Sequence, residues 1–400
     1  MTAPLNVLQR HMLKRQLADP ASCKYIIPTF VRLRPGIDPV RFAAAWNRAA
    51  ASFEIFRARI AGSASGGYEW RETDPAGPAM TVIDVADEDL LRLRDEIAPI
   101  DVFAERPVRA ALYRTPHRGV WSAVDFHHLA LDGFGFRALN GLVERAYFDP
   151  AAAIPSDGAF ARLAASAEEE KSARFRQALE YWQDTYGRDT WSACPRPDRD
   201  LGGAAQGEVF FELPVSVSEF WRICRERDAL PVLLMQAVAL RAIAEDTGVS
   251  RALIGWTCHG RTRCDRDLGL PLIKDLVLGA DTGLPDEELL SVLRKRHYEA
   301  LRASVCPWTA TESCPLADQV VDLLYQGDLR SAEGQSARLY QNDPDESDGY
   351  SIGSQNILDI EIIEKNERLL VYFDYSAARY SSERIQEFKA LFIRHFLAIT

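Results

Sequence analysis

FHHLALDGFGF, residues Phe126–Phe136, is the stretch that decides how this chain is interpreted. Alternating apolar residues before it predict a strand, and apolar residues at helical spacing after it predict a helix. His127 and His128 therefore end a strand, and Asp132 and Gly133 form the turn into the helix. Because neighbouring residues on a strand point to opposite faces, we expect one histidine to face a packed interior and the other an opening.

The turn has the residue types of a reactive site. Gly133 permits a positive φ and lets a backbone N–H come close to a reacting atom. Asp132 is a short acid that can fix the loop by pairing with a distant arginine. A bare pair of histidines is more often packed in a core, with the aspartate merely capping the helix. The histidine pair, the acid and the glycine together in a strand–turn–helix context favour a functional site instead.

Around this stretch, the sequence divides into two halves that both mix helices with strands. A Pro-, Ala- and Gly-rich connector precedes a charged helix predicted over Phe160–Tyr186, and a second irregular stretch follows that helix. The apolar segment Pro231–Thr247 predicts a buried helix. We expect an N-terminal lobe over 1–160, a bridging helix and connector over 161–206, and a C-terminal lobe over 207–400.

Composition places the chain among globular proteins. Its 400 residues are 47% hydrophobic and 26% charged, with 47 Lys and Arg against 58 Asp and Glu and a net charge of −11. This charge disfavours nucleic-acid binding, and no apolar run approaches the ~18 residues of a membrane span. Seven cysteines form no CxxC pair, which is typical of thiols in a reducing compartment. We expect a cytoplasmic protein with no nucleic-acid or membrane partner.

Two other patterns are weaker candidates. A metal site at His127, His128 and Asp132 is disfavoured because adjacent imidazoles point apart, so we expect no metal. Gly349–Gly353 reads GYSIG, formally the elbow of serine hydrolases. That elbow needs a strand before the serine and a helix after it, whereas here an acidic stretch precedes Ser351. We therefore do not expect a serine nucleophile.

HHLALDG resembles the HHxxxDG signature of nonribosomal peptide synthetase condensation domains and of related acyltransferases of the chloramphenicol-acetyltransferase type. The resemblance extends along nearly the whole chain. It departs from the family where a "GxFxN" segment is barely recognisable in Leu270–Val277 and an "HQxxPF" motif is reduced to Cys306–Trp308. Further motifs match in LNVLQRHML (Leu5–Leu13), SFEIFRARI (Ser52–Ile60), the pair Tyr181–Trp182, and IGWTCHGR (Ile254–Arg261).

The resemblance implies an α+β fold of two chloramphenicol-acetyltransferase-like lobes, arranged as a V-shaped pseudodimer with a central tunnel. It implies that His128 is the active-site histidine and that the Gly133 amide stabilises an oxyanion. His127 and Asp132 would be structural residues at the active site. Arg261, from the second half of the chain, would be the ion-pair partner of Asp132.

The function implied is acyl transfer that forms an amide bond between two substrates carried by donor and acceptor carrier proteins in nonribosomal peptide synthesis. The chain would bind no cofactor itself, because phosphopantetheine on the carriers would tether the substrates. Alternatives are an O-acyltransferase that makes an ester, an epimerisation domain, and a non-catalytic recruitment domain. A "DGVSW"-like continuation typical of epimerisation is replaced here by DGFGF. Four arginines are candidates for contact with an acidic carrier protein: Arg32, Arg34, Arg92 and Arg94.

The sequence contains neither an adenylation domain nor a carrier-protein serine motif. We therefore expect either a free-standing enzyme or one domain of a longer synthetase, producing for example an antibiotic or a siderophore. Substrate identity is not readable from the sequence, because the tunnel walls would come from both lobes.

Overall fold

The computed structural model describes residues 1–400 except 64–65, 188–189, 202–204, 311–319, 329–337 and 342–356. The chain forms two compact units. The first unit contains Met1–Glu170, and the second begins at Lys171. Two later pieces belong to the first unit, His259–Ile273 and the described residues 338–341. The predicted lobe boundaries assumed that each lobe is one continuous stretch of sequence. In the structure, each unit instead consists of several separate stretches.

The first unit is built on a four-stranded sheet with the order β2-β7-β6-β5. Its strands β2, β7 and β6 pair antiparallel, and β5 pairs parallel with β6. A second, three-stranded sheet has the order β1-β4-β3. The strands are β1 (Thr2–Pro4), β2 (Ile26–Arg32), β3 (Ala58–Ser63), β4 (Gly67–Glu72), β5 (Thr81–Asp84), β6 (Val108–Arg114) and β7 (Val120–His127).

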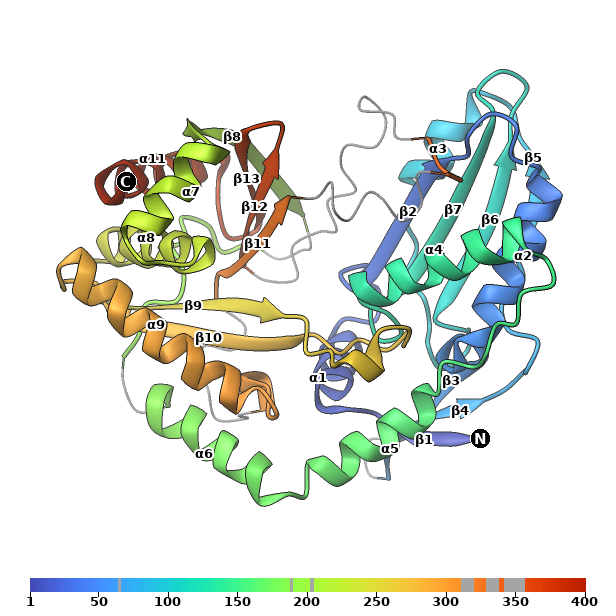
Figure 1. Cartoon of the computed structure of the whole chain (residues 1–400), viewed down its shortest axis with the longest axis horizontal. Helices are drawn as coiled ribbons and strands as arrows, with labels where there is room; N and C mark the ends of the chain where they lie inside the picture. Colours follow the sequence, from blue (N-terminus) through green and yellow to red (C-terminus); the bar gives the residue numbers. More distant parts are fainter. Residues whose placement is uncertain (64–65, 188–189, 202–204, 311–319, 329–337, 342–356) are drawn as a thin grey trace. The chain divides into compact units, whose positions relative to one another are not determined.

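Helices α2 and α4 pack against each other in this unit, and Figure 1 shows α4 crossing in front of β2, β7 and β6. The Asp38 carboxylate caps α2 by accepting the N–H groups of Val40 and Arg41, and Pro39 occupies the first turn, as the sequence predicts. The helices are α1 (Val7–Ala18), α2 (Pro39–Ser52), η1 (Glu54–Arg57), α3 (Asp89–Asp95), α4 (Gly133–Phe148), α5 (Ala159–Glu169) and η2 (Arg263–Asp265).

The second unit is built on a six-stranded sheet with the order β10-β9-β11-β12-β13-β8. Strand β11 pairs parallel with both β9 and β12, and the other neighbours pair antiparallel. The strands are β8 (Gln206–Ser216), β9 (Arg251–Cys258), β10 (Lys274–Asp281), β11 (Asp322–Asp328), β12 (Leu358–Lys365) and β13 (Arg368–Ser376).

Several helices of the second unit pack against this sheet. Helix α8 packs against α9, α11 and β9, and residues around its whole circumference are buried, which confirms the prediction for Pro231–Thr247. Gly248 ends α8 in the left-handed conformation. The helices are α6 (Ala173–Tyr186), α7 (Val217–Glu226), α8 (Pro231–Thr247), α9 (Asp286–Ala303), η3 (Trp308–Ala310) and α11 (Ser382–Ile399).

One predicted helix is wrong. The single charged helix expected over Phe160–Tyr186 is two helices, α5 and α6, which belong to different units. Ser172 is the reason for the break, because its side chain accepts the Phe175 N–H and starts α6 as an N-cap. No helix among the described residues is long and apolar enough to cross a membrane.

Candidate active site

His127 is the last residue of β7, and its ring is fully buried. Its Nδ1 accepts the Leu129 N–H at 3.1 Å, and its ring stacks on Tyr25 with centroids 6.2 Å apart. Since Nδ1 accepts, the proton of the neutral ring is on Nε2. Burial, and secondarily the charge of His128, lower the pKa of His127 to about 3. This ring is therefore a neutral structural group that holds the turn.

His128 follows with its side chain only partly covered, so the two histidines differ in exposure as expected for neighbours on a strand. Its backbone N–H donates to the Tyr25 carbonyl at 2.7 Å, which extends the sheet pairing by one residue. Burial lowers the pKa of His128, while nearby backbone groups and the Asp132 carboxylate oppose that effect. The imidazole is thus neutral near pH 7 and able to accept a proton.

Asp132 ends the turn and is only 1% exposed. One carboxylate oxygen accepts the Gly135 N–H at 2.8 Å, which makes Asp132 the N-cap of α4. The same oxygen accepts from Arg261 Nη2 at 2.6 Å, and the other accepts the Leu272 N–H at 2.9 Å. A buried carboxylate is tolerated when it is paired and hydrogen-bonded in this way. The ion pair implied by the resemblance is present.

Arg261 organises the segment that reaches Asp132. Its side chain is 5% exposed and donates to three backbone carbonyls as well as to Asp132. The carbonyl acceptors are Asp265 at 2.7 Å, Leu268 at 3.0 Å and Leu270 at 2.8 Å. The expected origin of this arginine in the second lobe is corrected here, because His259–Ile273 belongs to the first unit.

The two glycines after Asp132 have different surroundings. Gly133 does not use the positive φ that a glycine permits, because it is the first residue of α4 and is absent from the residues with positive φ. A Cβ there would meet no atom within 4 Å, so its N–H lies at an open helix N-terminus without an acceptor inside the helix. Gly135, in contrast, lies in close contact with its surroundings. A Cβ at Gly135 would lie 2.7 Å from the Gly269 carbonyl oxygen.

Polar side chains of the N-terminal region tie the two loops of the site to the rest of the unit. Gln9 on α1 donates to the Leu129 carbonyl at 2.8 Å. Asn6, the N-cap of α1, donates to the Pro271 carbonyl at 3.3 Å. Both residues lie in the LNVLQRHML motif, but no contact was predicted for Asn6, whose signal was a cap residue three positions before a glutamine.

The buried carboxylate of Glu54 and the half-buried carboxylate of Asp157 lie near this region. Glu54 accepts the Phe160 N–H at 2.7 Å, and Asp157 accepts the Gly269 N–H at 3.0 Å. Burial raises the pKa of Asp157, while its backbone hydrogen bonds oppose the rise. Asp157 was not predicted as a site residue, because it lies within the stretch that was interpreted only as a connector.

The other residues that the sequence singled out do not form part of the histidine turn or lie outside the described residues. His259 is exposed, and its Nδ1 accepts the Arg261 N–H at 3.0 Å. Ser351 of the GYSIG pattern lies outside the described residues. Within the described ranges, no group of three or more metal-ligating side chains is found. The six described cysteines are free thiols.

A comparison with solved structures identifies the fold. The condensation domain of the monacolin K polyketide synthase MokA superposes with a TM-score of 0.80 at 17% identity, covering 99% of this chain and 96% of that one. The first condensation domain of the calcium-dependent antibiotic synthetase, in complex with a substrate analogue, gives 0.76 at 15% identity over 100% and 97%. The X-domain in its complex with OxyB from teicoplanin biosynthesis gives 0.79 at 17% identity over 99% and 93%. The predicted fold class, with two chloramphenicol-acetyltransferase-like lobes, is confirmed.

Two curated relatives match over part of their length. One, from Salinispora arenicola (strain CNS-205), is named "Probable non-canonical nonribosomal peptide synthetase (NRPS) CymA" and is 27% identical over 297 residues. The other is the isonitrile lipopeptide synthase of Streptomyces coeruleorubidus, 25% identical over 280 residues. The matches cover 70% and 64% of this chain but only 4% and 18% of the relatives.

The family model named "Condensation domain" matches residues 1–270, which include the histidine turn and nearly all of the segment that reaches Asp132. The chain therefore belongs to the condensation-domain family of nonribosomal peptide synthetases.

Proposed function

We propose that this chain forms an amide bond by transferring an acyl or aminoacyl group from a carrier-protein thioester to an amine held on a second carrier protein. The observation that carries the proposal is the placement of His128. It is a neutral, partly exposed imidazole at the end of β7, followed by a turn that buried hydrogen bonds hold in one conformation. In the proposed reaction, phosphopantetheine on the carriers presents both substrates.

The bond changes balance without a further reactant. The amine nitrogen attacks the thioester carbonyl, the C–N bond forms, and the C–S bond breaks. His128 accepts the proton that the nitrogen loses and passes it to the departing thiolate. The Gly133 N–H, at the open N-terminus of α4, donates to the oxyanion of the tetrahedral intermediate.

The reaction requires only a moderate rate contribution from the general base. A thioester is an activated acyl group, and an α-amine with a pKa near 8 is roughly one-tenth neutral at pH 7. Holding the reactants in line supplies about 7–11 kcal/mol of the barrier. General base catalysis typically adds about 10²–10⁴-fold. We therefore expect His128→Ala to lose roughly two to four orders of magnitude in rate while retaining a residual reaction.

The test presents the purified chain with a donor carrier loaded with an acyl thioester and an acceptor carrier loaded with an aminoacyl thioester. Intact mass spectrometry then measures the condensed product. His127→Asn is unsuitable as a control because it disturbs the turn, so the matched control is His117→Asn, an exposed histidine of the same unit that lies outside the site. We expect product from the wild type and His117→Asn, and a large loss in His128→Ala.

Three outcomes would contradict the proposal. Product formed on a free alcohol but not on the tethered amine would identify an ester-forming enzyme. A wild-type rate in His128→Ala would remove the general base from the mechanism. A chain that forms no product while binding other biosynthetic enzymes would be a recruitment domain.

A further inference from the structure

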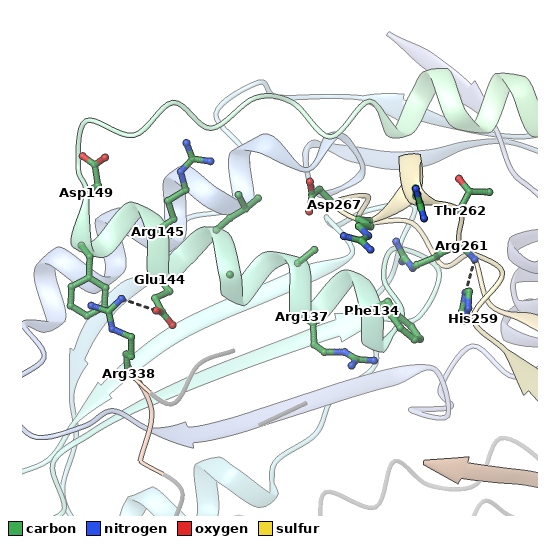
Figure 2. Close-up of a pocket in the computed structure, with 16 residues that line it drawn as sticks. Phe134, Arg137, Glu144, Arg145, Asp149, His259, Arg261, Thr262, Asp267 and Arg338 are labelled. Atoms are coloured by element: carbon green, nitrogen blue, oxygen red, sulfur yellow. Dashed lines mark hydrogen bonds and ion pairs between the residues drawn. The ribbon is translucent and has the colours of Figure 1, made fainter. Parts of the chain in front are cut away.

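A long groove follows the outer side of α4 in the first unit. It has a volume of about 1030 Å³ and is lined by residues of α4 and of the 259–267 segment, together with Asp149 and Arg338. Figure 2 shows Phe134 and His259 at one end of the groove and Arg338 and Asp149 at the other. With 16 residues, α4 is about 24 Å long, so the groove has the length of a helix rather than that of a single small group.

The lining of the groove is basic although the chain carries a net charge of −11. Two of its arginines have carboxylate partners, since Arg261 pairs with Asp132 and Arg338 pairs with Glu144 at 3.1 Å. Four others have no carboxylate within 4 Å among the described residues, and this is the unusual feature of the surface. The four are Arg137, Arg145, Arg263 and Arg266, and the acidic residues of the lining are Glu144, Asp149 and Asp267.

Aromatic rings at both ends of α4 orient two of the guanidinium groups. Arg137 lies over the ring of Phe134 at 4.2 Å, and Arg338 lies over the ring of Phe148 at 3.9 Å. Phe134 is 37% exposed and Phe148 is 42% exposed. Stacking leaves the edge of a guanidinium, which carries its N–H donors, available for oxygen acceptors. The groove therefore offers apolar contact at its ends and cationic donors along it.

Gly141 gives an independent reason to expect close approach by another molecule. It lies in the interior of α4, it is exposed, and a Cβ there would meet no atom within 4 Å. A glycine inside a helix costs about 1 kcal/mol relative to alanine, and nothing in the described fold requires it. With Ala138 one turn earlier, it lowers the surface in the middle of the groove.

We propose that the α4 groove is the docking surface for an acidic helix of a carrier protein, an inference that rests on the proposed function. The groove matches a helix in length, its unpaired arginines match acidic side chains, and Gly141 allows a partner to approach the backbone of α4. The groove begins at Phe134, immediately after the turn that contains His128. A carrier seated there would have its tethered group beside the loop that carries the base.

Three of the four arginines first considered for this contact have polar partners elsewhere. Arg34 donates to the Tyr340 carbonyl at 3.0 Å, and Arg94 pairs with Asp95 at 2.7 Å. Arg92 pairs with both Asp89 and Glu96 on its own helix. The α4 groove thus replaces that set as the better basic surface for an acidic partner.

The test uses the full chain and the carrier pair of the condensation assay. The variants are Arg145→Glu combined with Arg266→Glu, and separately Gly141→Gln, which fills the groove without changing charge. The control is Arg174→Glu, an exposed residue in the first turn of α6 where an acid suits the helix N-terminus. Each variant is also assayed with a soluble N-acetylcysteamine thioester and amine, which need no carrier docking.

We expect both groove variants to raise KM for one of the two carriers at least tenfold, with the soluble substrates turned over at the wild-type rate. The wild-type KM should rise with salt, and the double charge variant should lose most of that salt dependence. Arg174→Glu should behave as the wild type. Equal carrier KM values in wild type and both groove variants would overturn the proposal.

Binding measurements separate this proposal from the proposed function. If the wild type forms no amide, the function fails, and docking is then measured by calorimetric titration of the same carriers into wild type and variants. Weaker carrier binding in both groove variants would still support the docking surface. Binding of coenzyme A that the variants abolish, with carrier binding unchanged, would overturn it and assign the groove to a small phosphorylated ligand.

Discussion

Asp132 in the first unit and Asp322 in the second are both largely buried, but their surroundings are opposite. Asp132 accepts hydrogen bonds from Arg261 and two backbone N–H groups. Asp322, at the start of β11, has Asp359 directly opposite in the register of β12. The Thr257 hydroxyl donates to it at 3.3 Å. Burial, and then the charges of Asp359 and Asp275, raise the pKa of Asp322 to about 8.

The row of acids around Asp322 continues across the sheet. Asp359 lies opposite Asp374 of β13, and Asp374 lies opposite Glu208 of β8. Carboxylates directly opposite on neighbouring strands destabilise a sheet when both are charged. The comparison teaches that burial alone does not define the state of a carboxylate. A cation and N–H donors hold the Asp132 carboxylate in place, whereas burial and like charges favour the protonated form of Asp322.

The largest effect should follow from removing Asp132. Asp132→Ala leaves Arg261 buried without its partner, and breaking a buried pair in this way typically costs about 3–5 kcal/mol. We expect hydrogen–deuterium exchange to accelerate in α4 and in residues 268–272, with α8 of the second unit as an internal reference that stays protected. Arg261→Ala should have a similar effect, and the double variant should cost much less than the sum. Unchanged exchange in α4 would contradict the structural role of the pair.

A smaller effect is expected at Gly135. Gly135→Ala places a methyl group 2.7 Å from the Gly269 carbonyl oxygen, and overpacking of this kind typically costs about 1–3 kcal/mol. Gly141→Ala on the same helix meets no atom and should stabilise the unit by up to about 1 kcal/mol. Thermal unfolding of the two variants beside the wild type checks the opposite signs. Equal melting temperatures for Gly135→Ala and Gly141→Ala would contradict this prediction, because they would mean that the loop at Gly269 moves to accommodate the added methyl group.

The smallest effect concerns Asp322 and depends on pH. Its pKa is near 3.8 when unfolded and about 8 in the fold, so the folded state holds a proton that the unfolded state releases. Stability from this group is therefore present at low pH and is lost as pH rises from about 4 to about 8. Asp322→Asn should change little at pH 5 and stabilise the second unit by about 1–2 kcal/mol at pH 9.

Urea unfolding of the Asp322→Asn variant at pH 5, 7 and 9 provides the measurement. Asp281→Asn, at the exposed end of β10 in the same sheet, is the matched control and should show no pH-dependent gain. The same gain at pH 5 and pH 9 would mean that Asp322 does not hold a proton in the folded state.

Local signals in the sequence predicted the elements that local physics determines. The strand that ends at His127, the helix that follows Asp132 and the buried helix α8 all agree with the structure. The split between α5 and α6 was missed because Ser172 sits inside a run of charged residues with strong helix propensity. Strand β11 pairs parallel with β9 and β12, which no local pattern encodes.

The site was predictable in its residues but not in its architecture. The strand–turn–helix context of His128 and Asp132 could be derived from periodicity, and the Arg261 pairing came from the resemblance. The residue type of Gly133 permits a positive φ but does not require it, and in the structure this glycine simply begins the helix. The contacts of Asn6 and Asp157 with the 269–271 loop join residues more than 100 positions apart, so only the folded structure reveals them.

The pairing of Asp132 with Arg261 has a consequence during synthesis of the chain. The two residues are 129 positions apart, so at about 5–20 residues per second the arginine leaves the ribosome roughly 6–26 seconds after the aspartate. Until then, the first unit lacks both the cation and the Leu272 N–H that its buried carboxylate requires. We therefore expect the nascent first unit to remain open around the histidine turn, and to close only when nearly half of the second unit has also emerged.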